Sequence, residues 1–217
     1  MTALPVTLAG SSPARPPASR DKRKAILDAA TSVFARRGFF QAQVADVARA
    51  AGVAAGTVYL YFSSKDDVLA SVFERTMREA VAEARALVEA VDDPIEQLGR
   101  LAHLHLGRLG RNRDLAVVFQ VELRQSTKFM ERFSAAQLRE YLGIIRDAIA
   151  RGQSTGAMRP DVNPTVASKI LFGALDEMAT DWILSQRPRR LEDSADTVVD
   201  IFVRGMASSD GTSGERG

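Results

Sequence analysis

The chain has 217 residues, of which 46% are hydrophobic, so it can bury a core in one two-part unit or in two small domains. It contains no cysteine, which excludes disulfides, thiolate metal sites and cysteine nucleophiles. No apolar run approaches the ~20 residues of a membrane span, and no charged-then-apolar leader is visible. These features predict a protein of the reducing cytoplasm.

The charges are unevenly placed, although the formal net charge is only +2. Residues 1–62 hold eight lysines and arginines against three acids, whereas the rest of the chain holds 21 basic and 24 acidic residues. A basic N-terminal part indicates a polyanion as partner, and a solvated helix surface is the equally supported alternative.

The first elements predict a small helical unit. Residues 1–20, with four prolines among small residues, are typical of a flexible arm. An apolar stripe from Ala25 to Phe34 predicts a helix that ends at Gly38. Val44 to Ala51 predict a second helix, which is followed by a tight turn at Gly52 and by a third, short helix. This arrangement is a helix-turn-helix.

The hexapeptide at 57–62 has the β-branched and aromatic composition of a strand. We nevertheless predict a helix here, with Val58 and Phe62 packed inward, because tertiary packing overrides local propensity. Two serines and two aspartates at 63–67 have the spacing of a capping box and predict the start of a long helix. Further helical patterns cover about 64–88, 94 onward, 138–149, 164–185 and 191–206, with no strand pair, so we predict an all-α fold of about nine helices.

Inward packing of Val58 and Phe62 leaves Thr57, Tyr59 and Tyr61 facing a partner. Hydroxyl groups and aromatic edges suit phosphate oxygens and base edges in a major groove. Aromatic residues of a small domain are otherwise simply core, which is our interpretation of three phenylalanines, Phe34, Phe39 and Phe62.

The stretch from Arg23 to Phe73, centred on "AAGVAAGTVYLYFSSKDDVLASVF", resembles the TetR family of bacterial repressors. The resemblance implies a homodimer with an N-terminal helix-turn-helix and a helical C-terminal domain for ligand binding and dimerisation. Ala42-Gln43 stand where the family often has Thr-Thr or Thr-Ser, and the Gln43 amide can still donate to phosphate. The implied contacts to double-stranded operator DNA come from Gln43, Ala55, Gly56, Thr57, Tyr59, Leu60, Tyr61 and Lys65.

Two later segments, "LAVVFQVELRQS" (115–126) and "LFGALDEMATDWILSQ" (171–186), resemble the FadR group within this family. That group controls fatty-acid degradation genes and releases DNA on binding long-chain acyl-CoA. The resemblance therefore implies a repressor with acyl-CoA as its small-molecule effector, and we expect no cofactor. The expected organisation is an arm (1–20), a helix-turn-helix domain (21–66), a ligand-binding and dimerisation domain (67–206) and a disordered tail (207–217).

Glu122 and Asp176 lie on apolar helix stripes, where a carboxylate is costly unless it is paired. Each either pairs with a neighbour such as Arg124 or Gln125, or lines a polar part of a ligand site. An acyl chain needs an apolar tunnel between helices, although ordinary core is the alternative for each apolar residue. The candidate ligand-binding residues are Leu104, Arg108, Phe119, Glu122, Gln125, Leu142, Ile145, Phe172, Asp176 and Trp182.

Two basic clusters are candidates for holding the phosphates of CoA, and solvated loop charges are the alternative. They are Arg108, Arg111 and Arg113, and Arg187, Arg189 and Arg190. His103 and His105 lie two apart on a helix and point in different directions, so no metal site is expected.

Three other functions compete with an acyl-CoA-responsive repressor. One is a TetR-type regulator of a different hydrophobic ligand, such as a drug or another acyl thioester. A second is an enzyme acting on acyl thioesters, which the lack of cysteine and of a Gly-x-Ser-x-Gly elbow disfavours. A third is a helical adaptor, which leaves the exposed tyrosines unexplained.

Overall fold

The computed structural model describes residues 19–123, 136–185 and 189–207, and within them it contains nine α-helices and no strand. The prediction of an all-α fold is confirmed. The elements are α1 (Ser19–Arg37), α2 (Val44–Ala50), α3 (Ala55–Tyr59), α4 (Lys65–Glu89), α5 (Pro94–Arg111), α6 (Arg113–Val117), the π-helical turn η1 (Val118–Glu122), α8 (Gln137–Ser154), α9 (Pro164–Leu184), the 3₁₀ turn η3 (Leu191–Ser194) and α10 (Ala195–Gly205).

Local chemistry explains most of the helix boundaries. Gly38 ends α1 with φ +75° and Gly52 makes the turn between α2 and α3 with φ +68°, a region that glycine enters without a Cβ penalty. The Ser64 hydroxyl accepts a hydrogen bond from the Asp67 backbone N–H at 3.1 Å, so the predicted N-cap of α4 is confirmed. Asp93 caps α5 in the same way.

Three boundaries differ from the sequence prediction. Helix α1 begins at Ser19, two residues inside the predicted arm. Residues 113–122 form a short helix that ends in a π-helical turn instead of continuing as one α-helix. The last predicted helix starts with a 3₁₀ turn, so α10 begins only at Ala195.

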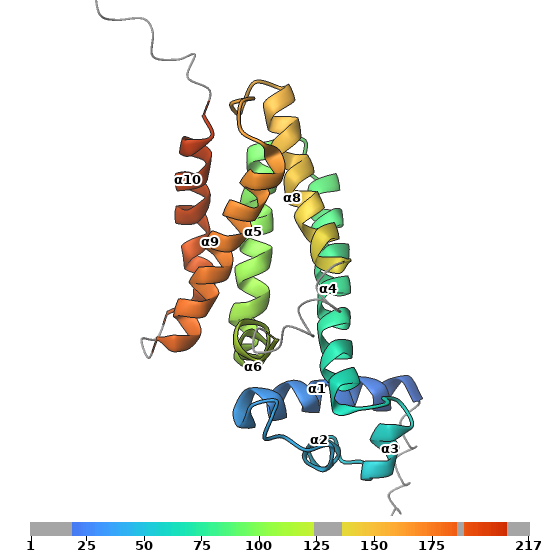
Figure 1. Cartoon of the computed structure of the whole chain (residues 1–217). Helices are drawn as coiled ribbons and strands as arrows, with labels where there is room; N and C mark the ends of the chain where they lie inside the picture. The colour runs from blue at the N-terminus through green and yellow to red at the C-terminus, as the bar shows by residue number, and fades with distance from the viewer. Residues whose placement is uncertain (1–18, 124–135, 186–188, 208–217) are drawn as a thin grey trace, which may run out of the picture.

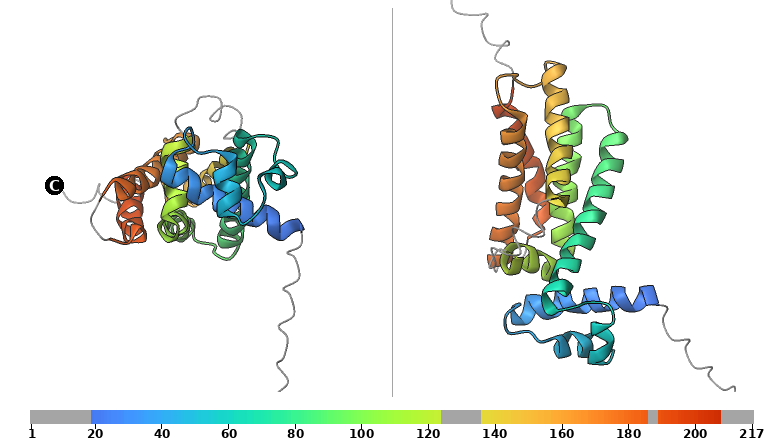
Figure 2. Two further views of the ribbon diagram at one scale, coloured as in Figure 1. Left: turned by 90° about the horizontal axis from the view of Figure 1, so that it is seen from below. Right: turned by 45° about the vertical axis from the view of Figure 1, so that its right-hand side comes forward.

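Helices α1–α3 form a small unit at one end of the molecule, and α4 runs from this unit into a helical bundle (Figure 1). The bundle is built from α4, α5, α8 and α9, with α10 packed on the outside against α5 and α9 (Figure 2). Phe34 and Val58 are buried in the core of the small unit, and Leu106, Ile145 and Leu175 are buried in the bundle. No helix in the described part of the chain is long and apolar enough to cross a membrane.

Candidate DNA-binding surface and internal cavity

Helix α3 presents its polar and aromatic side chains outward. Val58 and Phe62 are almost fully buried, which confirms their predicted inward packing. Tyr59 and Leu60 are 58% and 82% exposed, while Thr57 and Tyr61 are partly exposed. Such a surface, facing away from the bundle, can enter a groove of DNA without disturbing the core.

Three further predicted DNA contacts lie at helix starts near this surface. Ala55 and Gly56 are exposed in the first turn of α3, where side chains are small and the backbone is accessible. Gln43 is exposed at the N-cap of α2, so its amide is available to a phosphate beside the positive end of the helix.

Lys65, which was predicted to contact a DNA phosphate, binds backbone carbonyl groups within the protein. Its ammonium donates hydrogen bonds to the carbonyl oxygens of Phe39 (2.7 Å) and Ala42 (2.9 Å), and more weakly to that of Phe40 (3.2 Å). It also lies 4.6 Å from the centre of the Phe39 ring. Lys65 therefore ties the loop between α1 and α2 to the start of α4, and its contact with phosphate stays a prediction.

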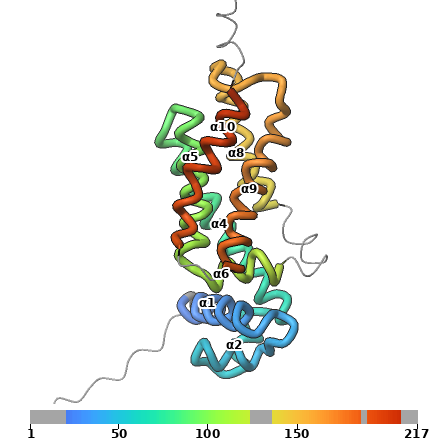
Figure 3. Tube along the Cα trace, turned by 90° about the vertical axis from the view of Figure 1, so that its left-hand side faces the viewer, coloured from blue at the N-terminus to red at the C-terminus, as the bar shows by residue number. Residues whose placement is uncertain are grey.

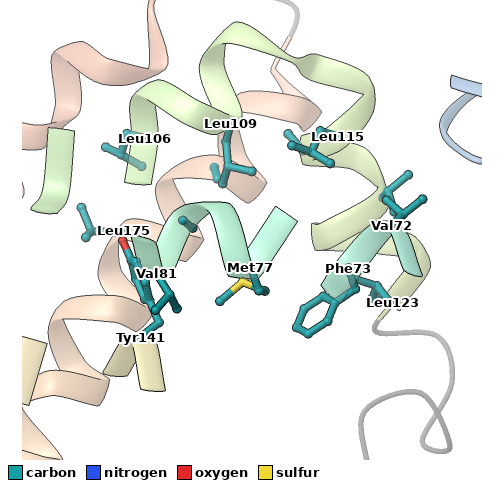
Figure 4. Close-up of a cluster of buried hydrophobic side chains, with 14 of the residues drawn as sticks. Val72, Phe73, Met77, Val81, Leu106, Leu109, Leu115, Leu123, Tyr141 and Leu175 are labelled. Atoms are coloured by element: carbon teal, nitrogen blue, oxygen red, sulfur yellow. The ribbon is translucent and has the colours of Figure 1, made fainter. Parts of the chain in front are cut away.

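The bundle contains a partly open cavity of about 300 Å³ between α4, α5, α8, α9 and the segment around η1. Its wall is mainly apolar, and Figure 4 shows several of its side chains converging from different helices. The lining residues are Phe73, Thr76, Met77, Ala80, His105, Arg108, Leu109, Leu115, Phe119, Gln120, Leu123, Leu138, Tyr141, Phe172 and Asp176.

The structure brings four of the ten predicted ligand-binding residues to this wall, namely Arg108, Phe119, Phe172 and Asp176. Five others do not line it: Leu104, Glu122, Leu142, Ile145 and Trp182. Ile145 is fully buried in the bundle core, which was the alternative considered from the sequence. Gln125 lies outside the described residues.

Glu122 points toward the small N-terminal unit instead of the cavity. Its carboxylate accepts a hydrogen bond of 2.7 Å from the backbone N–H of Phe39, and the residue is 94% buried. The π-helical turn explains the difference, because its i→i+5 hydrogen bonds rotate Glu122 away from the stripe of Phe119. Glu122 thus joins the segment that carries the cavity wall to the end of α1.

Asp176 has a side-chain partner that the sequence did not indicate. The amide nitrogen of Gln120 donates a hydrogen bond to the Asp176 carboxylate. The Thr180 hydroxyl donates to the Gln120 amide oxygen at 3.3 Å and to the Asp176 carbonyl at 3.1 Å. This small network fixes the polar corner of the cavity between η1 and α9.

Most of the basic residues near the cavity are engaged in ion pairs or in hydrogen bonds to the backbone. Arg108 pairs with Glu83 and with Glu79 (3.2 Å) on α4, and only 14% of its side chain is exposed. Arg113 donates to the Ile183 carbonyl at 2.7 Å. Of the second cluster, Arg187 lies outside the described residues, and the other two arginines, Arg189 and Arg190, pair with Asp181 and Glu192.

Trp182 lies at the end of α9, away from the cavity. The Arg113 guanidinium lies 5.0 Å from the centre of its ring, and its indole N–H donates to the Arg189 carbonyl at 2.9 Å. The first contact holds the start of α6 against the end of α9, and the second joins the end of α9 to the segment before η3. Trp182 therefore does not line this cavity, and its part in ligand binding stays a prediction.

A polar pocket of about 400 Å³ adjoins the cavity between α1, α4, α5 and α6. It shares Thr76, Arg108 and Leu115 with the apolar cavity. Arg111, also in its wall, forms no ion pair with any described residue. The two pockets together place charged groups beside an apolar space.

His105 and Tyr141 are the main residues that sequence reasoning missed. His105 was considered only as a metal ligand, and Tyr141 only as part of an apolar stripe. Burial lowers the pKa of His105, with the Asp176 carboxylate opposing the shift, and burial raises the pKa of Tyr141. Both side chains are therefore neutral at pH 7. The only sign of these residues in the sequence was that each places a polar group, an imidazole or a phenol, on an otherwise apolar helix stripe.

Comparison with known proteins agrees with this architecture. Residues 26–72 match the family of bacterial regulatory proteins called the tetR family, and residues 73–205 match the C-terminal region of YsiA-like proteins. The fatty acid metabolism regulator protein of Bacillus subtilis (strain 168) is 32% identical over 86% of this chain and 96% of its own length.

Two solved structures show the same fold across 84% of this chain and 98% of theirs. The fatty acid degradation regulator FadR from Bacillus halodurans is 34% identical with a TM-score of 0.79. FadR from Bacillus subtilis, solved in complex with stearoyl-CoA, is 31% identical with a TM-score of 0.80. With its helix-turn-helix and helical C-terminal bundle, the chain belongs to the TetR family of bacterial transcriptional regulators.

Proposed function

We propose that the protein is a cytoplasmic homodimeric repressor that binds palindromic operator DNA and is released from it by long-chain acyl-CoA. Its targets would be fatty-acid degradation genes. The observation that carries the proposal is the apolar cavity, whose wall includes Phe73 and Met77 of α4. The same helix begins just after α3, so a ligand in the cavity contacts the element that positions the DNA-binding surface.

The size and chemistry of the cavity support an acyl chain as the ligand. About 300 Å³ lies at the lower end of the range for small-molecule sites, and most of the wall is apolar. Each methylene removed from water contributes ~0.8 kcal/mol, so affinity should rise steeply with chain length. The relative solved with stearoyl-CoA supports the same ligand class for this chain.

The adjoining polar pocket supports a place for the phosphates of CoA. A chain in the cavity can extend past Arg108 and Thr76 into this pocket, where Arg111 is a cation without an ion pair among the described residues. Arg111→Gln should weaken acyl-CoA binding while leaving operator affinity unchanged. Arg100→Gln is the matched control on α5, because Arg100 already pairs with Glu96.

A direct test measures operator binding by fluorescence anisotropy, with a DNA site selected by the protein from random sequence. Long-chain acyl-CoA should release the DNA, and free CoA and free fatty acid should not. Tyr59→Ala should abolish operator binding and keep the dimer, while Thr155→Ala, at the far end of α8, should change neither. Normal operator affinity in the Tyr59 variant would refute the DNA-binding role.

A second candidate is a TetR-type regulator of a different hydrophobic ligand, such as a drug or another acyl thioester. The engagement of Arg108 with two glutamates favours it, since a cation already paired is less available to phosphate. Release of operator DNA by apolar drugs, with no response to acyl-CoA, would support a regulator of a different hydrophobic ligand.

A further inference from the structure

Two side chains in the cavity wall have unused hydrogen-bonding capacity. The Nε2 atom of His105 is buried and has no hydrogen-bond partner among the described residues. The hydroxyl of Tyr141, a residue that is 97% buried, forms no hydrogen bond with any residue of the described part. Buried polar groups in proteins are nearly always paired, so the His105 nitrogen requires an explanation, and the Tyr141 hydroxyl in the same cavity wall is available to a ligand.

The two groups belong to one cluster of rings. The His105 and Tyr141 ring centres are 6.0 Å apart, and Phe172 packs against both at 5.3 and 6.3 Å. These residues come from α5, α8 and α9, so three helices place the imidazole and the phenol side by side on the cavity wall.

The cluster offers neutral hydrogen-bonding groups. Burial lowers the pKa of His105 and raises that of Tyr141, so the phenol keeps its proton and the imidazole is uncharged at pH 7. Arg108, the arginine among the lining residues, is paired with two glutamates. A carboxylate or phosphate placed here would lose its hydration without gaining an opposite charge, whereas a neutral oxygen would gain hydrogen bonds.

We propose that Tyr141 and His105 act together to recognise a neutral carbonyl or hydroxyl oxygen carried by an apolar chain in the cavity. The inference deepens the proposed function and rests on it, since it specifies which part of the ligand the pair contacts. The oxygen can be the thioester carbonyl of an acyl-CoA or an oxygen substituent on the chain, and these sources are separable by experiment.

The test measures dissociation constants by calorimetry for four ligands: dodecanoyl-CoA, its thioether analogue dodecyl-CoA, 3-hydroxydodecanoyl-CoA and dodecan-1-ol. If Tyr141 and His105 bind the thioester carbonyl, wild type should bind dodecanoyl-CoA about tenfold more tightly than dodecyl-CoA. A similar preference for the hydroxylated chain over dodecanoyl-CoA would assign the chain oxygen instead. Tyr141→Phe and His105→Phe should bring the relevant ratio close to one.

Phe119→Leu is the matched control, because it alters the apolar wall and should weaken all ligands without changing their ratio. Tyr141→Phe should also keep or raise the melting temperature without ligand, since it removes a hydroxyl that has no hydrogen-bond partner among the described residues. A hydroxyl with a structural role would instead give a lower melting temperature, which would contradict the inference.

The outcomes separate the two proposals. Equal binding of all CoA ligands, unchanged ratios in both variants and no effect on dodecan-1-ol would overturn the oxygen-recognition role while leaving acyl-CoA sensing intact. Failure of every CoA ligand to bind wild type would overturn acyl-CoA sensing. In that case tighter binding of dodecan-1-ol to wild type than to Tyr141→Phe would still support the pair, and equal binding would reject it.

Discussion

Glu122 is a single buried carboxylate that links the cavity segment to the DNA-binding unit. Its hydrogen bond from the Phe39 N–H ends next to Gly38, where α1 stops. The Phe39 carbonyl is in turn bound by Lys65 at the start of α4. One short loop is therefore held from two sides, by η1 and by α4.

Replacing Glu122 by leucine should lower the free energy of unfolding by about 1–3 kcal/mol, because the buried Phe39 N–H loses its acceptor. Glu122→Gln should retain most of the stability, since the amide oxygen can accept the same hydrogen bond. Urea unfolding followed by circular dichroism measures both. Operator binding by the leucine variant should also respond less to ligand, and a variant as stable and as responsive as wild type would argue against the link.

The lowered pKa of His105 predicts how the free energy of unfolding depends on pH. Its pKa is lowered in the folded protein, so below pH 6.5 the unfolded chain binds a proton that the folded chain does not. Stability therefore falls as the pH drops through this range. Between pH 7.5 and 5.5 wild type should lose about 1 kcal/mol more than His105→Phe, as measured by urea unfolding at each pH. An equal loss in both proteins would contradict the direction of the shift.

At the scale of elements, the segment from α6 to η1 shows what the sequence could predict and what it could not. Helix caps at Ser64 and Asp93 were readable because they depend on residues within a few positions of each other. A π-helical turn leaves no comparable signal, so Leu115, Phe119 and Glu122 were placed on one stripe. The structure keeps Leu115 and Phe119 in the cavity wall and turns Glu122 away.

The DNA-binding surface was predictable from the sequence, whereas the cavity was not. The exposed face of α3 follows from Val58 and Phe62 alone, so the arrangement of the DNA-binding surface was predictable from local spacing. The cavity depends on how α4, α5, α8 and α9 pack against one another, which periodicity does not specify. Apolar stripes therefore predicted burial correctly for Ile145 but could not distinguish core from lining.

The junction between α6 and α9 can be followed through the lone tryptophan. Arg113→Met removes a guanidinium over the Trp182 ring and two hydrogen bonds to the end of α9. Acrylamide should then quench Trp182 fluorescence more strongly than in wild type. Arg100→Met, on the exposed side of α5, should leave quenching unchanged. A quenching constant unaffected by the Arg113 change would mean that this contact does not cover the ring.

At the scale of the whole molecule, α9 and α10 lie side by side on one side of the bundle (Figure 3), and both carry exposed apolar side chains. Val166, Ile170 and Ile201 are 52%, 58% and 67% exposed in the isolated chain. Regulators of this family act as dimers. We propose that a two-fold interface covers these side chains, since an interface between copies removes exposed apolar surface from water.

Ile170→Asp combined with Ile201→Asp should convert the proposed dimer to a monomer, as measured by analytical ultracentrifugation. The reason is that two charges would be buried without partners at the interface. Leu60→Asp is the matched control, since Leu60 is 82% exposed directly after α3. This substitution should affect DNA binding without affecting the mass of the assembly. A double variant that sediments like wild type would place the interface elsewhere.

The continuity of α4 has a mechanical consequence. Its 25 residues run without a break from Lys65 past Phe73 and Met77 in the cavity wall. Lys65 itself donates a hydrogen bond to the loop between α1 and α2. At 1.5 Å of rise per residue, Lys65 and Met77 are about 18 Å apart along the axis, so a tilt of about 5° moves one relative to the other by about 1.5 Å. We therefore expect α4 to act as a lever. In a two-fold assembly the two levers swing in opposite senses, and the spacing between the DNA-reading surfaces changes by twice the displacement of either one.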